Sequence, residues 1–519
     1  MADPTPLLPH STSSDLISAP PISLDSVIER VTANSAWPQL LQALLISLSW
    51  FFDGQQTFIT VYTDAEPTWH CTEHPNTTCR PTSNICDLST STWAWDKPSY
   101  TTIISDFNLQ CATPLISCLP ASSFFFGCLL GGFVLATLAD SSLGRRNLLF
   151  LSCFTMCVAS LITAFSTNVI VYAAWRFVSG FGRASVGACA LVLSTEIVSR
   201  KLRGRIGIAG FLCFSFGFLS LPGIAYVNRY SSWRTLYVWT SVPGILYSVL
   251  VFFFANESPK WLFTRGRKDE AVATLGRLGH NNHSSLNLHL SGIPLLEESQ
   301  EVDLFSSLKI LFEKKWAFRR TLALMVVGFG VGMVYYGMPL GVGNLGFNIY
   351  LSLTFNALSE IPSFALVFFF IGKWNRKSSL LTFMMISGVC SIMCVVCVVV
   401  SSKWKALQIG LEIVSFFSAN TAFSIIMVYT LELFPTCVRN SATSMVRQGL
   451  VLGGIFSLVI SAGRNYNEFL SYGVFGVVII CCGVLVLSLP ETKGLALCDT
   501  MDEQERKEVA DPINTIMLN

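Results

Sequence analysis

The sequence has little charge. Lys, Arg, Asp and Glu make up 13% of its 519 residues, whereas roughly 25% is usual in a soluble domain. Hydrophobic residues make up 52%, and the mean hydropathy is +0.55. This composition excludes an ordinary soluble domain, because so much apolar surface needs lipid as its solvent. The net charge of +2 also leaves no basic field that would attract nucleic acid.

Several motifs that mark enzymes and ATP-driven pumps are missing as well. The sequence contains no Walker A motif (G-x-x-x-x-G-K-[ST]), so ATP is not expected to be the direct energy source. No pair of CxxC motifs and no His/Cys cluster suggests zinc, and no nucleophile–base pair stands out in the long loops. We therefore expect no cofactor, no metal and no enzymatic activity. Residues 1–36 are polar and contain five prolines, which predicts a disordered cytosolic tail rather than a cleavable signal peptide.

Long hydrophobic runs, in contrast, are abundant. A helix that spans a membrane needs about 20 mostly apolar residues, and twelve segments meet this condition. They lie at residues 38–61, 113–138, 147–166, 169–195, 206–227, 235–255, 320–341, 346–371, 379–401, 406–433, 442–462 and 470–489. The sequence therefore predicts an all-α membrane protein with twelve transmembrane helices in a lipid bilayer.

The positions of the basic residues predict how the chain is oriented. Loops after even-numbered helices carry twenty Lys and Arg residues, and loops after odd-numbered helices carry seven. Because cytosolic loops are the basic ones, the central loop 256–319 and the C-terminal tail 490–519 are predicted to be cytosolic. The long loop 62–112 then faces the outside or an organelle lumen, and its Asn76-Thr-Thr sequon is a predicted glycosylation site.

The same loop holds four of the seventeen cysteines, namely Cys71, Cys79, Cys86 and Cys111. An even number of cysteines in a loop outside the cytosol predicts two disulfides. Three pairings are possible, and the spacing does not choose between them. The other cysteines lie in or beside apolar helices, where a free thiol acts as a small hydrophobic group.

Charge motifs at the predicted cytosolic helix ends recur along the chain. Glu196 and Arg203 have the same E-x6-R spacing as Glu432 and Arg439, at an offset of 236 residues. Two further motifs recur in the same order: Asn256-Glu-Ser-Pro-Lys260 with Pro490-Glu-Thr-Lys493, and Gly144-Arg-Arg146 with Asn375-Arg-Lys377. Parallel six-helix repeats are typical of transporters that rock one half against the other around a midplane site. The predicted halves are residues 37–255 and 320–489.

These cytosolic charges are predicted to act in gating. We expect acids and bases to pair across the two halves when the inner gate is shut, and so to bias an equilibrium between two conformations. The candidate residues are Asp140, Arg145, Arg146, Glu196, Arg203, Glu432 and Arg439. The segment Asp140-Ser-Ser-Leu-Gly-Arg-Arg146 resembles the loop motif of the major facilitator superfamily, with one extra residue between Asp and Gly.

Further stretches resemble one family within that superfamily. They are Asp106-Phe-Asn-Leu-Gln-Cys111, Glu257-Ser-Pro-Lys-Trp-Leu262, Tyr335-Tyr-Gly337, Gly343-Asn-Leu-Gly-Phe-Asn-Ile-Tyr350, Tyr429-Thr-Leu-Glu-Leu-Phe-Pro-Thr436 and Pro490-Glu-Thr-Lys-Gly494. Together they resemble the organic cation/carnitine transporter family, plant-type branch. The resemblance implies the major facilitator fold and a secondary active carrier of small organic cations or zwitterions, such as carnitine, quaternary ammonium compounds or polyamines.

Among the ionisable residues inside predicted spans, five stand out: Asp53, Arg183, Glu360, Glu412 and Arg447. A charge at membrane depth is costly and is by default a functional hypothesis. The alternative is that the five pair among themselves and hold helices together. We expect Arg183 and Glu412 to lie nearer helix ends, where water is close. Asp53 is the candidate for binding a coupling proton, because burial favours the protonated form of an acid.

The resemblance also suggests substrate-binding residues. Glu360 falls where the family carries an acid and is the first candidate for an ammonium-binding carboxylate. Tyr335 and Tyr336 would form part of an aromatic wall by cation–π contact. Helix 11 departs from the animal-type pattern, which has a charged residue at the position of Val451. The nearby base is Arg447, one helical turn earlier, and Arg can bind a substrate carboxylate. Cation and zwitterion therefore both stay open.

Two alternatives for function and two for location remain. A sugar porter shares the Glu-Ser-Pro and Pro-Glu-Thr motifs, and a membrane sensor could keep the fold and bind without transporting. A proton or sodium gradient is the expected driving force. The segment Asp3-Pro-Thr-Pro-Leu-Leu8 fits an acidic dileucine sorting signal. This motif favours the vacuolar membrane, with the plasma membrane as the alternative.

Overall fold

The computed structural model describes ten stretches of the chain. They are residues 36–72, 79, 84–138, 143–279, 304–341, 348–400, 405–435, 437–462, 470–494 together with 498, and 501–510. Four predictions concern positions outside these stretches: the disordered tail, the dileucine motif, glycosylation of Asn76 and gating by Asp140. For those four the structure adds nothing, and they stay predictions.

The N-terminal half begins with an interrupted helix. The predicted first span is divided into α2 (Ala36–Ser47), α3 (Ser49–Phe58) and α4 (Thr60–Thr63). The intervening Leu48 and Ile59 keep right-handed helical backbone angles. The three segments therefore continue one another. The remaining helices of this half are α6 (Pro114–Leu138), α7 (Arg145–Thr163), α8 (Val169–Ile197), α9 (Arg200–Val227) and α10 (Trp233–Phe254).

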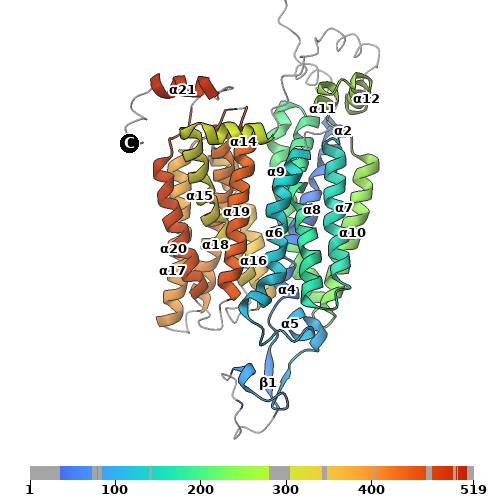
Figure 1. The fold of residues 1–519 in the computed structure, drawn as a ribbon, viewed down its shortest axis with the longest axis vertical. Coiled ribbons are helices and arrows are strands. Elements are labelled where there is room, and N and C mark those ends of the chain that lie inside the picture. The colour runs from blue at the N-terminus through green and yellow to red at the C-terminus, as the bar shows by residue number, and fades with distance from the viewer. Residues whose placement is uncertain are drawn as a thin grey trace, which may run out of the picture.

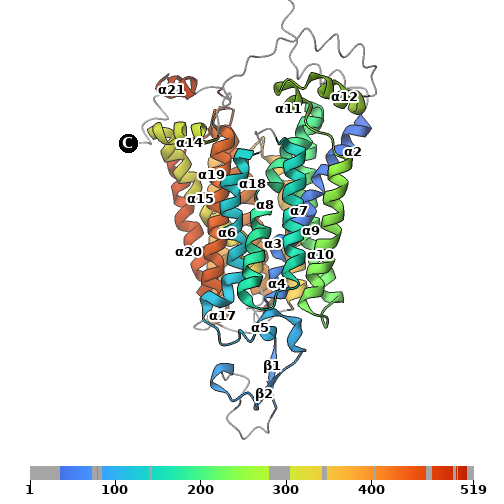
Figure 2. The ribbon, with the colours of Figure 1, turned by 45° about the vertical axis from the view of Figure 1, so that its right-hand side comes forward.

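The C-terminal half repeats this order with long continuous helices. They are α15 (Lys315–Gly341), α16 (Ile349–Phe370), α17 (Arg376–Val400), α18 (Lys405–Leu433), α19 (Arg439–Ala462) and α20 (Leu470–Val484), which runs into the short 3-10 helix η5 (Leu485–Ser488). Within the described residues, eleven helices of the two halves are long and apolar enough to cross a membrane. The broken first helix is the twelfth predicted span. The two halves lie beside each other in both views (Figures 1 and 2).

Short helices and strands cover the two ends of this bundle. At one end lie α11 (Pro259–Thr264), α12 (Lys268–Gly279), α14 (Leu304–Glu313) and α21 (Met501–Ala510) (Figure 1). The opposite end carries the loop after the first helix, which contains β1 (Trp69–Cys71), η1 (Ile85–Asp87), β2 (Trp93–Trp95), η2 (Ser99–Thr101) and α5 (Ile103–Asp106). The two strands pair antiparallel, with Cys71 opposite Trp93. The basic loops and the cysteine-rich loop thus lie at opposite ends, as the distribution of Lys and Arg predicts.

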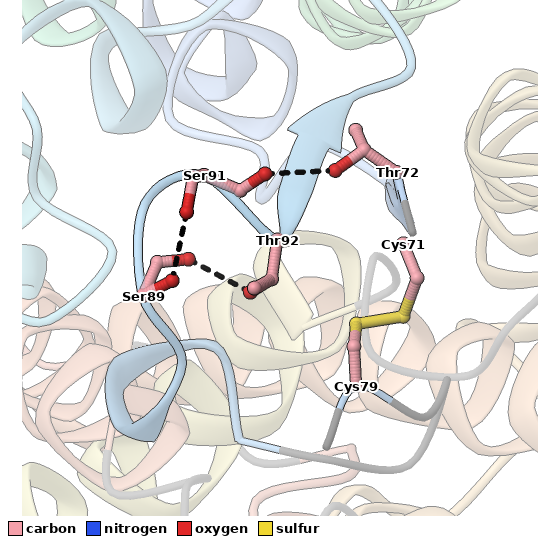
Figure 3. Close-up of a disulfide and its surroundings, with 6 residues drawn as sticks. All are labelled: Cys71, Thr72, Cys79, Ser89, Ser91 and Thr92. Carbon is pink, nitrogen blue, oxygen red and sulfur yellow. Dashed lines mark hydrogen bonds between the residues drawn. A yellow bond between two sulfur atoms is a disulfide. The ribbon is translucent and has the colours of Figure 1, made fainter. Parts of the chain in front are cut away.

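Two disulfides cross-link the cysteine-rich loop. Cys71 is bonded to Cys79, and Cys86 is bonded to Cys111. The Cys71–Cys79 bond lies at the end of β1, beside a turn in which the hydroxyl of Thr72 donates to the carbonyl of Ser91 at 2.9 Å (Figure 3). The structure thus selects one of the three pairings that the sequence leaves open.

The two halves meet through close helix packing. At the contact of α6 with α19, the side chain of Gln448 occupies the space that a Cβ atom on Gly132 would fill. Where α9 meets α16, the rings of Phe211 and Phe364 stack with centroids 5.3 Å apart. Glycine at the first contact and flat aromatic stacking at the second bring the two bundles together at membrane depth.

Candidate functional site

Glu360 lies on α16 where this helix faces α9 of the other half. Its side chain is fully buried, at 0% exposure. The hydroxyl of Ser215 donates to Oε2 at 2.6 Å from the N-terminal half, and the hydroxyl of Tyr335 donates to Oε1 at 2.8 Å from the C-terminal half. Among the described residues, no Lys, Arg or His contacts this carboxylate. Glu360 is thus an acid held between the halves by neutral donors alone.

Tyr335 and Tyr336, on α15, belong to a buried aromatic cluster beside Glu360. The ring of Tyr335 stacks on Phe416 with centroids 5.6 Å apart and meets Phe58 of the other half edge-on at 6.3 Å. Tyr336 meets Phe125 on α6 at 4.8 Å. Rings from both halves therefore pack around Tyr335 and Tyr336, and Tyr335 contacts the carboxylate. Their electron-rich faces suit an organic cation.

Asp53 has a fixed basic partner. Nε of Arg183 on α8 donates to Oδ1 of Asp53 on α3, and Asp53 is only 2% exposed. Arg183 also points a guanidinium nitrogen at the sulfur of Cys128, at 3.6 Å. The expectation that Arg183 lies near a helix end is wrong, because it occupies the middle of α8. Glu412 does lie nearer a helix end, in the third turn of α18, but its side chain is fully buried rather than close to water.

Arg447, on α19, faces the same region from the C-terminal half. A Cβ atom on Gly187 of α8 would lie 3.3 Å from its guanidinium, so the absence of a side chain there lets Arg447 approach the other half. Arg183, Tyr336 and Asp53 are its electrostatic neighbours. Sequence analysis singled out these midplane residues one by one, and the structure brings them into one polar region between the halves.

A cavity of about 170 Å³ opens toward the cysteine-rich loop. Its lining comes from both halves, with Asp64 and Glu66 after α4, Leu340 on α15 and Leu458 on α19 among its residues. Two of the lining residues are acidic and none is basic. Among the described residues, the cavity therefore has an acidic lining at the end of the bundle that carries the cysteine-rich loop.

The repeated charges at the end of the bundle opposite the cysteine-rich loop, which is predicted to be cytosolic, form two similar clusters. Arg145 pairs with Glu196 at 3.0 Å in the N-terminal half, and Arg376 pairs with Glu432 at 2.8 Å in the C-terminal half. Each of these ion pairs joins residues of one half. Pairing across the halves is expected for the state in which the inner gate is shut, and it stays a prediction.

A second acid completes each cluster. Glu257 accepts the backbone N–H of Arg146 at 3.1 Å, and Glu491 accepts the backbone N–H of Arg376 at 2.8 Å. Both acids thus bind the positively polarised N-terminus of a helix, α7 or α17. Burial raises the pKa of Glu257, while its bonds from backbone N–H groups oppose that rise.

The two remaining gating candidates lie at helix starts. Arg203 is in the first turn of α9, and Arg439 begins α19 and donates to the carbonyl oxygen of Phe434 at 3.3 Å.

Sequence reasoning missed Ser215, because a serine in an apolar run carries no distinctive signal. It also passed over Arg176 as a functional charge. Arg176 precedes Glu412 by 236 residues, which is the offset of the repeat. This spacing would have identified Arg176 as a candidate functional residue.

Comparisons with known proteins agree with this architecture. The family model described as "Sugar (and other) transporter" matches residues 81–503. Organic cation/carnitine transporter 3 of Arabidopsis thaliana is 52% identical over 98% of this chain and 99% of its own length. Organic cation/carnitine transporter 2 of the same plant is 50% identical over 98% of both chains.

A solved structure extends the likeness to the fold. The proton:xylose symporter XylE superposes with a TM-score of 0.61 and covers 90% of this chain and 98% of its own, at 16% identity. That identity supports the fold alone. The repeated clusters, the two six-helix halves and the relatives agree: this chain is a multi-pass membrane transporter of the major facilitator superfamily and belongs to its organic cation/carnitine transporters.

Proposed function

We propose that this protein is a secondary active transporter of small organic cations or zwitterions, with Glu360 as the carboxylate that binds the ammonium group. The observation that carries the proposal is the environment of Glu360. The carboxylate is fully buried, receives hydroxyl donors from both halves and has no basic contact among the described residues. An ionised group at this depth costs several kcal/mol when it is unpaired. A bound ammonium ion offsets that cost.

The position of Glu360 also links binding to movement. Ser215 belongs to α9 and Tyr335 to α15, so a shift of one half relative to the other changes the donors that reach the carboxylate. A ligand that replaces these contacts has different affinities for the two arrangements. Differential affinity is what shifts a conformational equilibrium. Alternating access around this site is therefore part of the proposal.

Arg447 supports a zwitterion as the substrate. It lies in the same polar region, and its guanidinium can bind a carboxylate through two parallel hydrogen bonds. The ammonium group of carnitine would then face Glu360 and the tyrosines, while its carboxylate faces Arg447. Arg447→Gln should lower uptake of carnitine more than uptake of choline, which lacks a carboxylate. Equal losses for both substrates would count against this part of the proposal.

For coupling, we propose that Asp53 responds to a proton through its pair with Arg183. Protonation of the carboxyl group removes one charge of the pair and so weakens the contact of α3 with α8. Uptake measured with and without a proton uncoupler tests whether protons drive transport. Replacement of sodium by potassium in the medium tests the alternative ion.

The main test is the variant Glu360→Gln, which keeps the shape of the side chain and removes its charge. It should lower uptake of choline, carnitine and tetraethylammonium by at least about 100-fold, since a charged hydrogen-bonded contact contributes roughly 3 kcal/mol. Glu313→Gln, at an exposed position paired with Lys309, is the matched control and should transport normally.

Each other outcome of this test points to a different function. Normal uptake by Glu360→Gln at normal expression would remove Glu360 from the site. Accumulation of xylose or glucose but of no ammonium compound would favour a sugar porter. Saturable binding without accumulation at any pH would favour a sensor.

We further propose the vacuolar membrane as the location, on the basis of the motif that ends in Leu7 and Leu8. A fluorescent fusion of the full chain should move from the vacuolar to the plasma membrane when both leucines are changed to Ala. An unchanged location would remove this argument.

A further inference from the structure

A second buried acid lies in the C-terminal half, apart from Glu360. Glu412 occupies the third turn of α18, seven residues from the non-cytosolic start of the helix at Lys405, and is 0% exposed. Its single hydrogen bond comes from Asn356 on α16, whose Nδ2 lies 3.4 Å from Oε1. The other carboxyl oxygen, Oε2, is buried with no hydrogen-bond partner among the described residues, and so is Oδ1 of Asn356.

The neighbours of Glu412 that the structure describes offer no positive charge. Helices α15, α16, α17 and α19 pack against α18. Two titratable groups lie close to the carboxyl group: the thiol of Cys394 on α17 and the phenol of Tyr472 on α20, and both are neutral in their ordinary state. Tyr335, Glu360 and Arg447, the ionisable groups on α15, α16 and α19 that face the midplane, are not among its electrostatic neighbours. An ionised carboxylate here would be buried without a counter-ion, which is strongly unfavourable.

We propose that Glu412 and Asn356 form a proton-binding site within the C-terminal half. A proton on Oε2 turns this unpaired acceptor into a donor, and the amide of Asn356 has an unpaired acceptor in Oδ1. The two side chains can then close an acid–amide ring, in which Nδ2–H donates to Oε1 and Oε2–H donates to Oδ1. One proton thereby gives both Oε2 of Glu412 and Oδ1 of Asn356 a hydrogen-bond partner. Buried polar atoms in proteins normally have such a partner.

This site is placed to influence the proposed substrate site, on which the inference rests. Asn356 and Glu360 are four residues apart on α16 and therefore lie on the same face of the helix. Glu412 is nearer the non-cytosolic end than Glu360, so a proton from that side reaches it first. Loss of the proton breaks the acid–amide ring and leaves a charge that favours rehydration. Either effect moves α16 relative to α18 and hence moves Glu360.

The internal repeat supports a role for this position. Arg176 precedes Glu412 by 236 residues and, like it, lies seven residues from the start of its helix, α8. It too is 0% exposed. The N-terminal half thus has a permanent cation where the C-terminal half has a group that titrates. Only the C-terminal member of the pair can respond to pH.

The test uses the full-length protein in proteoliposomes with the membrane potential clamped at zero. Glu412→Gln imitates the protonated acid, because its amide can close the same ring with Asn356. It should retain exchange of labelled for unlabelled choline at equal pH within about twofold of wild type. Across a gradient of one pH unit it should lose the accumulation, which reaches up to about tenfold for coupling to one proton. Gradient-driven accumulation equal to that of wild type would overturn the proposal.

A spectroscopic readout separates this proposal from the proposed function. In infrared spectra of the purified protein, the carbonyl band of a protonated carboxylic acid should be weaker in Glu412→Gln than in wild type and in the control Glu313→Gln. An unchanged band would contradict the proton site whether or not the protein transports choline. Conversely, a wild-type protein that shows the band but exchanges no ammonium compound would contradict the proposed function while supporting the proton site.

Discussion

At the ends that are predicted to be cytosolic, the two halves carry the same Arg–Glu ion pair. Arg145 pairs with Glu196 in the N-terminal half, as Arg376 pairs with Glu432 in the C-terminal half. At membrane depth they differ. The N-terminal half has an internal ion pair between Asp53 and Arg183, whereas the acids of the C-terminal half contact only neutral groups among the described residues.

The difference suggests that the two halves have different roles in transport. A closed ion pair satisfies its own charges until a proton neutralises its carboxylate, as proposed for Asp53. An acid that contacts only neutral donors is left to find its counter-charge in a ligand or a proton. The C-terminal half, with Glu360 and Glu412, is therefore the half in which the substrate and a further proton are expected to act. The charge clusters at the predicted cytosolic end occur in both halves and therefore do not distinguish them.

The largest effect is expected from breaking the ion pair of the N-terminal half. Asp53→Asn leaves Arg183 buried without its carboxylate, which should lower the free energy of unfolding by about 3–5 kcal/mol. Thermal unfolding of the purified protein measures this loss. The double variant Asp53→Asn with Arg183→Gln should recover most of it, because no buried charge remains. Equal stability of Asp53→Asn and wild type would contradict the assignment of the pair as a structural element.

A smaller effect is expected at the cytosolic clusters, where the comparison predicts similarity. Arg376→Gln and Arg145→Gln each remove a charged hydrogen bond, which contributes about 1.5–3 kcal/mol. Both should lower the maximal transport rate to a similar extent, because each removes the basic partner of a repeated acid, Glu432 or Glu196. Uptake kinetics with a saturating ammonium substrate measure the rates. Loss of function in only one variant would show that the clusters are not equivalent.

The smallest effect concerns the cysteine-rich loop, which only the N-terminal half carries. The disulfide Cys86–Cys111 spans 25 residues and Cys71–Cys79 spans 8. Because a longer closed loop constrains the unfolded chain more, removal of the first should cost about 1 kcal/mol more than removal of the second. Thermal unfolding of the two double-serine variants gives the difference. A larger loss for the shorter loop would mean that local contacts outweigh loop entropy.

Much of the fold could be predicted from hydrophobic runs and charge repeats. The runs place most helix ends within a few residues, as for 113–138 against Pro114–Leu138 in the structure. The break of the first span into three segments was not predicted, since its apolar run continues through Leu48 and Ile59. Local patterns report how apolar a segment is. They do not report a local interruption of the helix such as those at Leu48 and Ile59.

The site was predictable as a set of residues but not as a set of contacts. Depth in the membrane marks Asp53, Arg183 and Glu360 as unusual charges. The partner of Asp53 is 130 residues away, and no periodicity in the sequence connects the two. Ser215 is one of many serines in apolar helices. Ser215 becomes a hydrogen-bond donor to Glu360 only because α9 packs against α16. The choice among three disulfide pairings depends in the same way on tertiary structure.

The most direct test of the central claim is a comparison of two ligands that have the same shape. Choline carries a quaternary nitrogen, and 3,3-dimethylbutanol has carbon in its place and no charge. Calorimetric titration of the purified wild-type protein should show choline binding at least about tenfold more tightly than the neutral alcohol, and Glu360→Gln should abolish this preference. If Glu360→Gln still prefers choline as strongly as wild type does, Glu360 does not bind the ammonium group.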